Sequence, residues 1–219
     1  MAKKSLEERI QRLEDIHEIQ NLASRYQYLQ TAGLHEETAE LFAQKTPGIR
    51  AEVGGRGVYE GTEGIQRMYV GVHKHRDGDG KGILNVLTLT TPVIEVAGDG
   101  KTAKGVWISP GFHTLAPKGK LQANWVWCKY GIDFVKEDGK WKFWHVHVYA
   151  IFYTPYERSW VETAKLEGQA EAAPSLPDEL KADRPATYRW MYNLTAKTEN
   201  VPAPPQPYET WDESTAYVK

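Results

Sequence analysis

Two histidines and a tyrosine alternate along one strand-like run near residue 147. His145, His147 and Tyr149 are each separated by a single residue, in a stretch rich in Trp and Tyr. Because strand side chains alternate between two faces, these three groups share one side. Imidazole titrates near neutrality and can act as a general acid or base. The spacing therefore predicts the wall of a pocket, with His145 and His147 catalytic and Tyr149 contacting the substrate.

The same His-X-His pair is open to two other interpretations. Its rings point the same way and could bind a metal, but a third ligand is needed. The chain has no His-Glu-X-X-His motif, and folding alone would have to supply the ligand from His73, His75, His113 or Asp133. We therefore expect no metal and no cofactor. The other interpretation is a structural pair bonded to backbone or tyrosine hydroxyls.

A second set of polar side chains lies on the preceding strand-like run, residues 122–136. Tyr130 and Asn124 share a face with Phe134, so a buried Phe134 would place both beside the same cavity. Asp133 falls on the opposite face and is expected at a surface or interface. The further candidates for substrate contact are Asn85, Trp107 and Tyr69.

Helices come first along the chain and strands follow. Apolar residues at three- and four-residue steps predict a long helix over 5–31 with Ser5 as N-cap, and shorter helices at 36–44 and from Thr62. From residue 86 to 153, β-branched runs joined by short turns predict an antiparallel meander. The pattern indicates the α+β class, with residues 1–154 as one domain. Residues 155–219 are proline-rich and predict an extended tail that packs on the domain or on a neighbouring subunit.

The composition indicates which classes of partner the protein does not bind. The formal net charge of −2 argues against nucleic acid and against an anionic membrane. No run approaches a membrane span, no signal peptide opens the chain, and the single Cys128 fits a reducing compartment, so we expect a cytoplasmic protein. Trp125, Trp127 and Trp144 should lie on the outer face of the sheet, which predicts a homo-oligomer, a dimer or trimer.

Several motifs agree in order and spacing with one family. Residues 5–153 resemble SnoaL-like proteins of the nuclear transport factor 2 superfamily, through segments 14–26, 40–42, 63–69, 90–96 and 129–142. The resemblance implies a cone-shaped NTF2-like fold, in which three N-terminal helices pack on a curved antiparallel sheet around one deep pocket. It also implies proton-transfer enzymes that need no cofactor.

The resemblance assigns roles to several residues. The Trp after the 137–140 turn usually packs on the helices in this family, and by parity from Trp141 both His145 and His147 then face the pocket. Tyr26 lies where the first helix floors the pocket and could hold an oxyanion with Tyr130. Many members carry an Asp shortly after this tyrosine, whereas this chain has Thr31 there. The histidine pair would then carry the chemistry.

The resulting hypothesis is a cofactor-independent lyase or isomerase acting by His and Tyr acid–base chemistry. The substrate would be a small hydroxylated aromatic or polycyclic molecule, and the reaction a dehydration, a retro-aldol cleavage that releases formaldehyde, or an isomerisation. Because this fold hosts many functions, two alternatives stay open. One is a non-catalytic binding or assembly module, and the other is a metal-dependent enzyme that uses the His-X-His pair.

Overall fold

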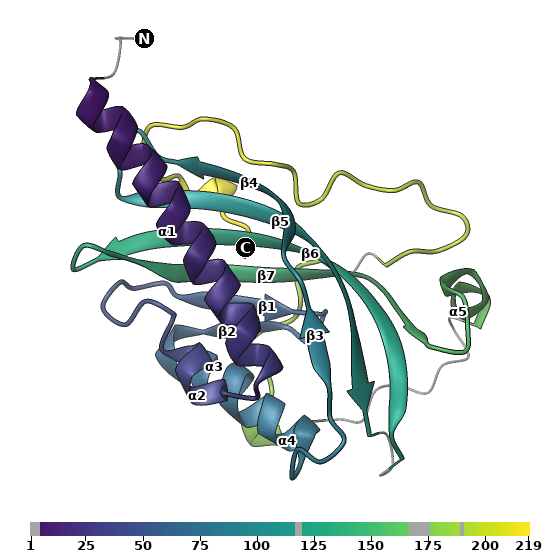
Figure 1. The fold of residues 1–219 in the computed structure, drawn as a ribbon. Helices are drawn as coiled ribbons and strands as arrows, with labels where there is room; N and C mark the ends of the chain where they lie inside the picture. The colour runs from purple at the N-terminus through teal and green to yellow at the C-terminus, as the bar shows by residue number, and fades with distance from the viewer. Residues whose placement is uncertain (1–4, 117–119, 167–175, 189–190) are drawn as a thin grey trace.

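A long helix crosses the concave side of a curved sheet (Figure 1). The structure is a computed structural model that describes residues 5–116, 120–166, 176–188 and 191–219. In α1 (Leu6–Thr31), Ser5 and Glu8 form a capping box, which confirms the expected N-cap. The expected apolar stripe contacts the core only further along, from Ile16 onward. Leu6 is 64% exposed because the first turns project beyond the sheet (Figure 1).

The shorter helices lie together at one edge of the sheet (Figure 1). They are α2 (His35–Ala39), α3 (Gly61–Gln66), η1 (Arg67–Val72) and α4 (His73–Asp77). The last three follow one another without a break, and η1 is wound as a π-helix. The apolar residues of this helical stretch, Ile65, Met68, Tyr69 and Val72, are all buried. No helix in the described ranges has both the length and the apolar character that a membrane span requires.

Seven strands form one mixed sheet. They are β1 (Arg50–Val53), β2 (Val58–Glu60), β3 (Asn85–Leu87), β4 (Thr90–Val96), β5 (Thr102–Leu115), β6 (Gln122–Glu137) and β7 (Lys140–Pro155). The order is β2-β1-β7-β6-β5-β3, with β4 also paired to β5. The expectation of a wholly antiparallel sheet is wrong, because β1 runs parallel to β7. The meander of β5, β6 and β7 is antiparallel, as the sequence predicts.

Two extra residues in β7 change which side chains face the helices. Phe134 pairs with Phe143, whereas Asp133 pairs with His145, so Trp144 is an extra residue in β7. The register shifts again between Trp127 and Cys128 of β6. Each bulge moves the following side chains of β7 to the opposite face of the sheet.

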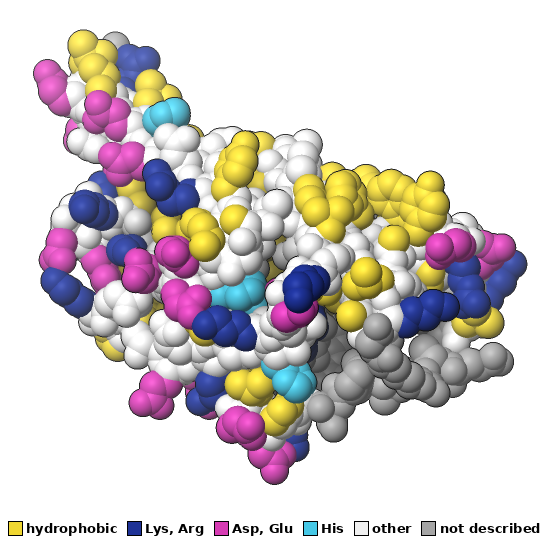
Figure 2. All heavy atoms as spheres, turned by 60° about the horizontal axis from the view of Figure 1, so that its bottom comes forward, with side chains coloured by type: hydrophobic (Ala, Val, Ile, Leu, Met, Phe, Trp, Pro, Cys, Tyr) yellow, Lys and Arg dark blue, Asp and Glu magenta, His cyan; other side chains and the backbone are white. Residues whose placement is uncertain are grey.

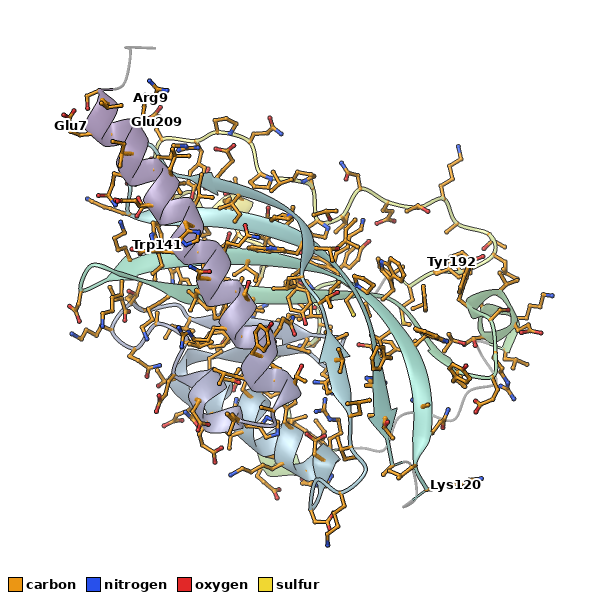
Figure 3. The ribbon with its side chains drawn as sticks, in the orientation of Figure 1. Glu7, Arg9, Lys120, Trp141, Tyr192 and Glu209 are labelled. Atoms are coloured by element: carbon orange, nitrogen blue, oxygen red, sulfur yellow. The ribbon has the colours of Figure 1, made fainter. Side chains whose placement is uncertain are left out.

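The core lies between α1 and the concave face of β5, β6 and β7. Trp141 points toward α1 (Figure 3), where its Nε1–H donates to Asp15 over 2.9 Å. Phe134 and Phe143 are fully buried beside it, which confirms Phe134 as a core residue. This contact fixes the phase of β7 before its first bulge.

The C-terminal residues return along the domain. After α5 (Trp160–Leu166), the chain passes the described elements η3 (Asp178–Leu180) and η4 (Glu213–Thr215). Arg184 bridges to Val58 at the free edge of β2, and Gly98 and Asp99 donate backbone N–H groups to Tyr208 and Glu209. Val218 is completely buried. The final residues thus cover the convex face of the sheet.

Candidate active site

His145 and His147 lie on the convex face of the sheet, away from α1. Nδ1 of His145 is 3.0 Å from Oδ2 of Asp133, and its Nε2 is 3.0 Å from the Gly48 carbonyl oxygen. Nδ1–H of His147 donates to the Tyr217 carbonyl over 2.8 Å. Both imidazoles are buried. The expectation that they face the pocket is therefore wrong.

The extra residue Trp144 explains the error. Trp141 and Phe143 face the helices, as parity predicts, but the bulge then places Val146 and Val148 in the core. Every later position as far as the second bulge is displaced by one, so the two histidines turn outward. A bulge of this kind has no marker in the local sequence.

Tyr149 and Asp133 belong to the same convex-face layer. Tyr149 stacks on His147 with ring centroids 3.7 Å apart, and its hydroxyl donates to the Tyr217 carbonyl rather than facing a substrate site. Asp133, expected at a surface, is fully buried and accepts from Lys104 Nζ over 2.8 Å. Its position opposite the core follows the predicted alternation.

Glu52 completes this layer beneath the tail. It accepts from the Thr187 backbone N–H over 2.8 Å and the Thr187 hydroxyl over 2.6 Å, and lies 3.5 Å from Nε2 of His147. The carboxylates and imidazoles thus already have protein partners. Buried groups with partners of this kind hold structure together.

Three predicted tyrosines meet in the core between α1 and the sheet. Tyr26 of α1 donates its hydroxyl to that of Tyr69 over 3.5 Å and packs edge-on against Tyr130, with ring centroids 6.2 Å apart. Burial raises the pKa of all three phenols above the usual value. They therefore stay protonated at neutral pH and can serve as hydrogen-bond donors.

Several polar atoms around these tyrosines are buried without a hydrogen-bond partner among the described residues. They are Gln27 Nε2, Gln30 Nε2, His35 Nδ1, His73 Nδ1, Ser109 Oγ and His113 Nε2. They come from α1, α2, α4 and β5. Buried polar groups are nearly always bonded, so these unpartnered atoms are the candidates for contact with a polar ligand.

His73 is almost fully enclosed among these groups. It follows directly on the π-helix η1, and its ring packs edge-on against Tyr69 and 5.1 Å from the ring of His35. Burial lowers the pKa of His73 well below its usual value, and the nearby Arg76 lowers it further. The imidazole is therefore neutral at pH 7 and can accept a proton. π-Helical turns often occur at functional sites, but no sequence signal marks this one.

His35 and Asp77 support His73 from the helical side. Nε2 of His35 lies 3.3 Å from Oδ2 of Asp77, and Arg76 forms two hydrogen bonds with the same carboxylate. Burial acts to raise the pKa of Asp77, but the hydrogen bonds from His35 and Arg76 outweigh it and lower the pKa overall. Asp77 stays charged and holds the ring of His35 in place.

A second histidine lies on β5 toward the open end of the cone. His113 stacks on Tyr153 with centroids 5.6 Å apart, and burial together with Arg76 and Arg56 lowers its pKa to about 4. The neighbouring Cys128 lies 3.9 Å from the Tyr153 hydroxyl. Burial raises the pKa of Cys128 to about 12, so the thiol is protonated and is not a nucleophile.

Three residues predicted to contact the substrate remain: Trp107, Asn124 and Asn85. Trp107 packs on Phe134 in the core, with centroids 6.1 Å apart. Asn124 is buried, and its amide bonds to Gln122 of its own strand. Asn85 is half-buried and pairs with His113 across β3 and β5.

At the end of α1, the position matching the family aspartate is a surface residue. Thr31 is exposed, whereas its neighbour Gln30 is buried and turns an unpartnered amide inward. A neutral amide therefore occupies the end of α1 inside the cone, and the basic groups come from α4 and β5.

A long helix laid across a curved mixed sheet, with aromatic and polar groups between them, defines an NTF2-like α+β protein. The chain belongs to the SnoaL-like domain family, whose profile matches residues 11–147. No curated protein matches the sequence.

Solved structures share the fold at low sequence identity. LinA is 18% identical with a TM-score of 0.58, over 68% of this chain and 95% of LinA. The hexachlorocyclohexane dehydrochlorinase LinA-type3 from Novosphingobium barchaimii LL02 is 20% identical with a TM-score of 0.55, over 68% and 95%. A protein from Novosphingobium aromaticivorans with the provisional name scytalone dehydratase is 16% identical, with a TM-score of 0.55 over 68% and 92%. At these identities the likeness concerns the fold.

Proposed function

We propose that this protein is a cofactor-independent lyase that catalyses an elimination inside the cone, with His73 as the general base. The observation that carries the proposal is the shell of buried, unpartnered polar atoms around Tyr26, Tyr69 and Tyr130. A neutral imidazole beside protonated phenols supplies a proton acceptor and proton donors in one enclosed place. The proposal keeps the predicted His and Tyr chemistry but moves the base from β7 to α4.

The reaction divides between these groups. His73 takes a proton from the carbon next to the one that bears the leaving group. The electrons of that C–H bond form the new double bond, and the bond to the leaving group breaks. A departing hydroxide takes a proton from Tyr26 or Tyr130 and leaves as water, whereas a halide leaves as the anion. Two fold neighbours carry the names of elimination enzymes, which supports this reaction class over retro-aldol cleavage and isomerisation.

The aromatic lining supports a ring-containing substrate. Phe42 and Phe143 lie beside the tyrosines, with the Phe42 ring 4.9 Å from Tyr69 and the Phe143 ring 5.5 Å from Tyr26. Such walls bind flat or alicyclic rings, while the few polar groups fix their orientation. We therefore keep a small hydroxylated aromatic or polycyclic molecule as the substrate.

The decisive experiment is turnover by purified protein on a panel of hydroxylated and halogenated cyclic compounds. On a substrate that reacts, His73→Gln should lower kcat by roughly 100-fold or more, the usual contribution of a positioned general base. His17→Gln changes an exposed histidine on α1 and serves as the control. Equal kcat for His73→Gln and the parent protein would disprove the assignment of the base.

A non-catalytic binding module is the second candidate. It is favoured by one observation: His145 and His147 are buried and bonded, as such a module predicts. Saturable binding of a ring compound, with no chemical change to it across the panel, would support this candidate against the lyase.

A further inference from the structure

One arginine in the turn between β1 and β2 has no counter-charge among the described residues. Arg56 lies in the turn between β1 and β2, is exposed, and forms no side-chain hydrogen bond or ion pair with any described residue. Two arginines on the adjacent helices differ, because Arg67 pairs with Asp183 and Arg76 with Asp77. A guanidinium without a counter-charge beside an enclosed site is available to an anionic ligand.

Arg56 is held close to the interior by a glycine. A side-chain carbon on Gly54 would meet the Tyr153 hydroxyl at 3.5 Å and Nη1 of Arg56 at 3.6 Å, so these two groups converge on one point. Gly54 also has a φ of 57°, a left-handed conformation that glycine adopts most readily. The turn thus brings the guanidinium next to the phenol.

Beyond Arg56 and the Tyr153 hydroxyl lie two less exposed polar groups. Tyr153 stacks on His113, which is half-buried and has an unpartnered Nε2. His73 is almost fully buried and also has an unpartnered nitrogen. Arg56 helps to lower the pKa of both histidines, so its charge acts on the interior. Exposure falls from Arg56 through His113 to His73, so a ligand that reaches from Arg56 to His73 would have one end at the surface and one end inside.

We propose that Arg56 recognises a carboxylate on the substrate, and that the substrate is a cyclic carboxylic acid bound with its ring among the tyrosines and its reacting carbon toward His73. A guanidinium and a carboxylate form two parallel hydrogen bonds, and the Tyr153 hydroxyl supplies a further donor. One cation and neutral donors match a planar monoanion better than a doubly charged phosphate. The proposal rests on the proposed function for the reaction but not for the binding.

The test compares two probes that differ only in charge, 4-hydroxybenzoate and 4-hydroxybenzamide, by calorimetric titration. The parent protein should bind the benzoate about 10-fold more tightly, as expected for one charge-assisted pair. Arg56→Gln should abolish this preference, and Arg56→Lys should restore part of it. Arg25→Gln changes an exposed arginine on α1 and should leave the preference intact.

Two outcomes would overturn the proposal. One is a parent protein that does not prefer the benzoate, including one that binds neither probe at millimolar concentration. The other is a preference that survives Arg56→Gln. His73→Gln should keep the preference while turnover is lost. In the parent protein, a preference for the benzoate without turnover of any compound in the panel would disprove the proposed reaction and leave the carboxylate site standing. Turnover without the preference would disprove the carboxylate site and leave the reaction standing.

Discussion

The backbone N–H of Tyr217 donates to Oδ2 of Asp133 over 2.9 Å and joins the end of the chain to the middle of the sheet. Asp133 also accepts from Lys104 and lies against His145, so one buried carboxylate holds two strands and the tail. The Tyr217 carbonyl in turn accepts from His147 and Tyr149. The C-terminal residues are thus part of the domain's packing.

Removing this carboxylate should destabilise the domain strongly. Asp133→Ala leaves the buried Lys104 ammonium without its ion-pair partner, and breaking a buried pair in this way costs about 3–5 kcal/mol. The free energy of unfolding, measured by urea titration with tryptophan fluorescence, should fall by that amount. Asp178→Ala breaks an exposed pair with Lys181 and should change it by less than about 1 kcal/mol. Equal effects of the two substitutions would contradict the role of Asp133.

Gly131 should be required for the tail to dock. A side-chain carbon at this position would lie 2.7 Å from Cδ1 of Tyr217 and 3.1 Å from Cε2 of Tyr149. Gly131→Ala should therefore cost about 1–3 kcal/mol in unfolding free energy through overpacking. In a Tyr217→Ala background the clash with Tyr217 is absent, so the same change should cost much less. A cost that is the same in both backgrounds would place the strain elsewhere.

Local patterns in the sequence are sufficient to predict much of the fold. The capping box at Ser5, the inward residues Ile65 and Met68, and the β5–β6–β7 meander all follow from short-range spacing. Tyr26, Tyr69 and Tyr130 could be chosen because their burial follows from helix and strand periodicity. These features depend on residues close in sequence.

A single inserted residue decides on which face of the sheet His145 and His147 lie. Trp144 has no property that distinguishes a bulged from a regular strand residue, yet it reverses His145 and His147. The parallel pairing of β1 with β7 and the meeting of His35 with His73 join distant segments, so no local pattern indicates them. Tertiary packing decides such features. For that reason the sequence indicates His73 only as a candidate third metal ligand.

Acidification should weaken the folded state between about pH 6.5 and 5. Burial lowers the pKa of His73 and His147, and lowers that of His113 to about 4. The unfolded chain therefore binds more protons than the native state once pH falls below about 6.5. The free energy of unfolding consequently decreases as the pH is lowered. Each histidine contributes at most about 2 kcal/mol at pH 5.

Urea midpoints at several pH values measure this loss. His113→Gln should make the dependence of unfolding free energy on pH shallower, whereas His17→Gln, at an exposed site, should leave it unchanged. Constant or rising stability toward pH 5 would show that these imidazoles are not buried in the neutral form.

The uncovered part of the convex face should bind a second copy of the chain. Figure 2 shows that hydrophobic side chains gather at several places on the surface, and that one such group lies away from the projecting start of α1. Trp125 and Trp127 are 45% and 40% exposed; Trp125 stacks on Tyr156, and Trp127 packs at a tilt against Phe152. Aromatic faces of this kind are usually buried at an interface.

We propose that this face forms the homo-oligomer, so Trp125→Glu combined with Trp127→Glu should give a monomer by sedimentation velocity. The same substitution at Trp160 alone, at the edge of the face, should weaken assembly less. A parent protein that sediments as a monomer at micromolar concentration would refute the interface.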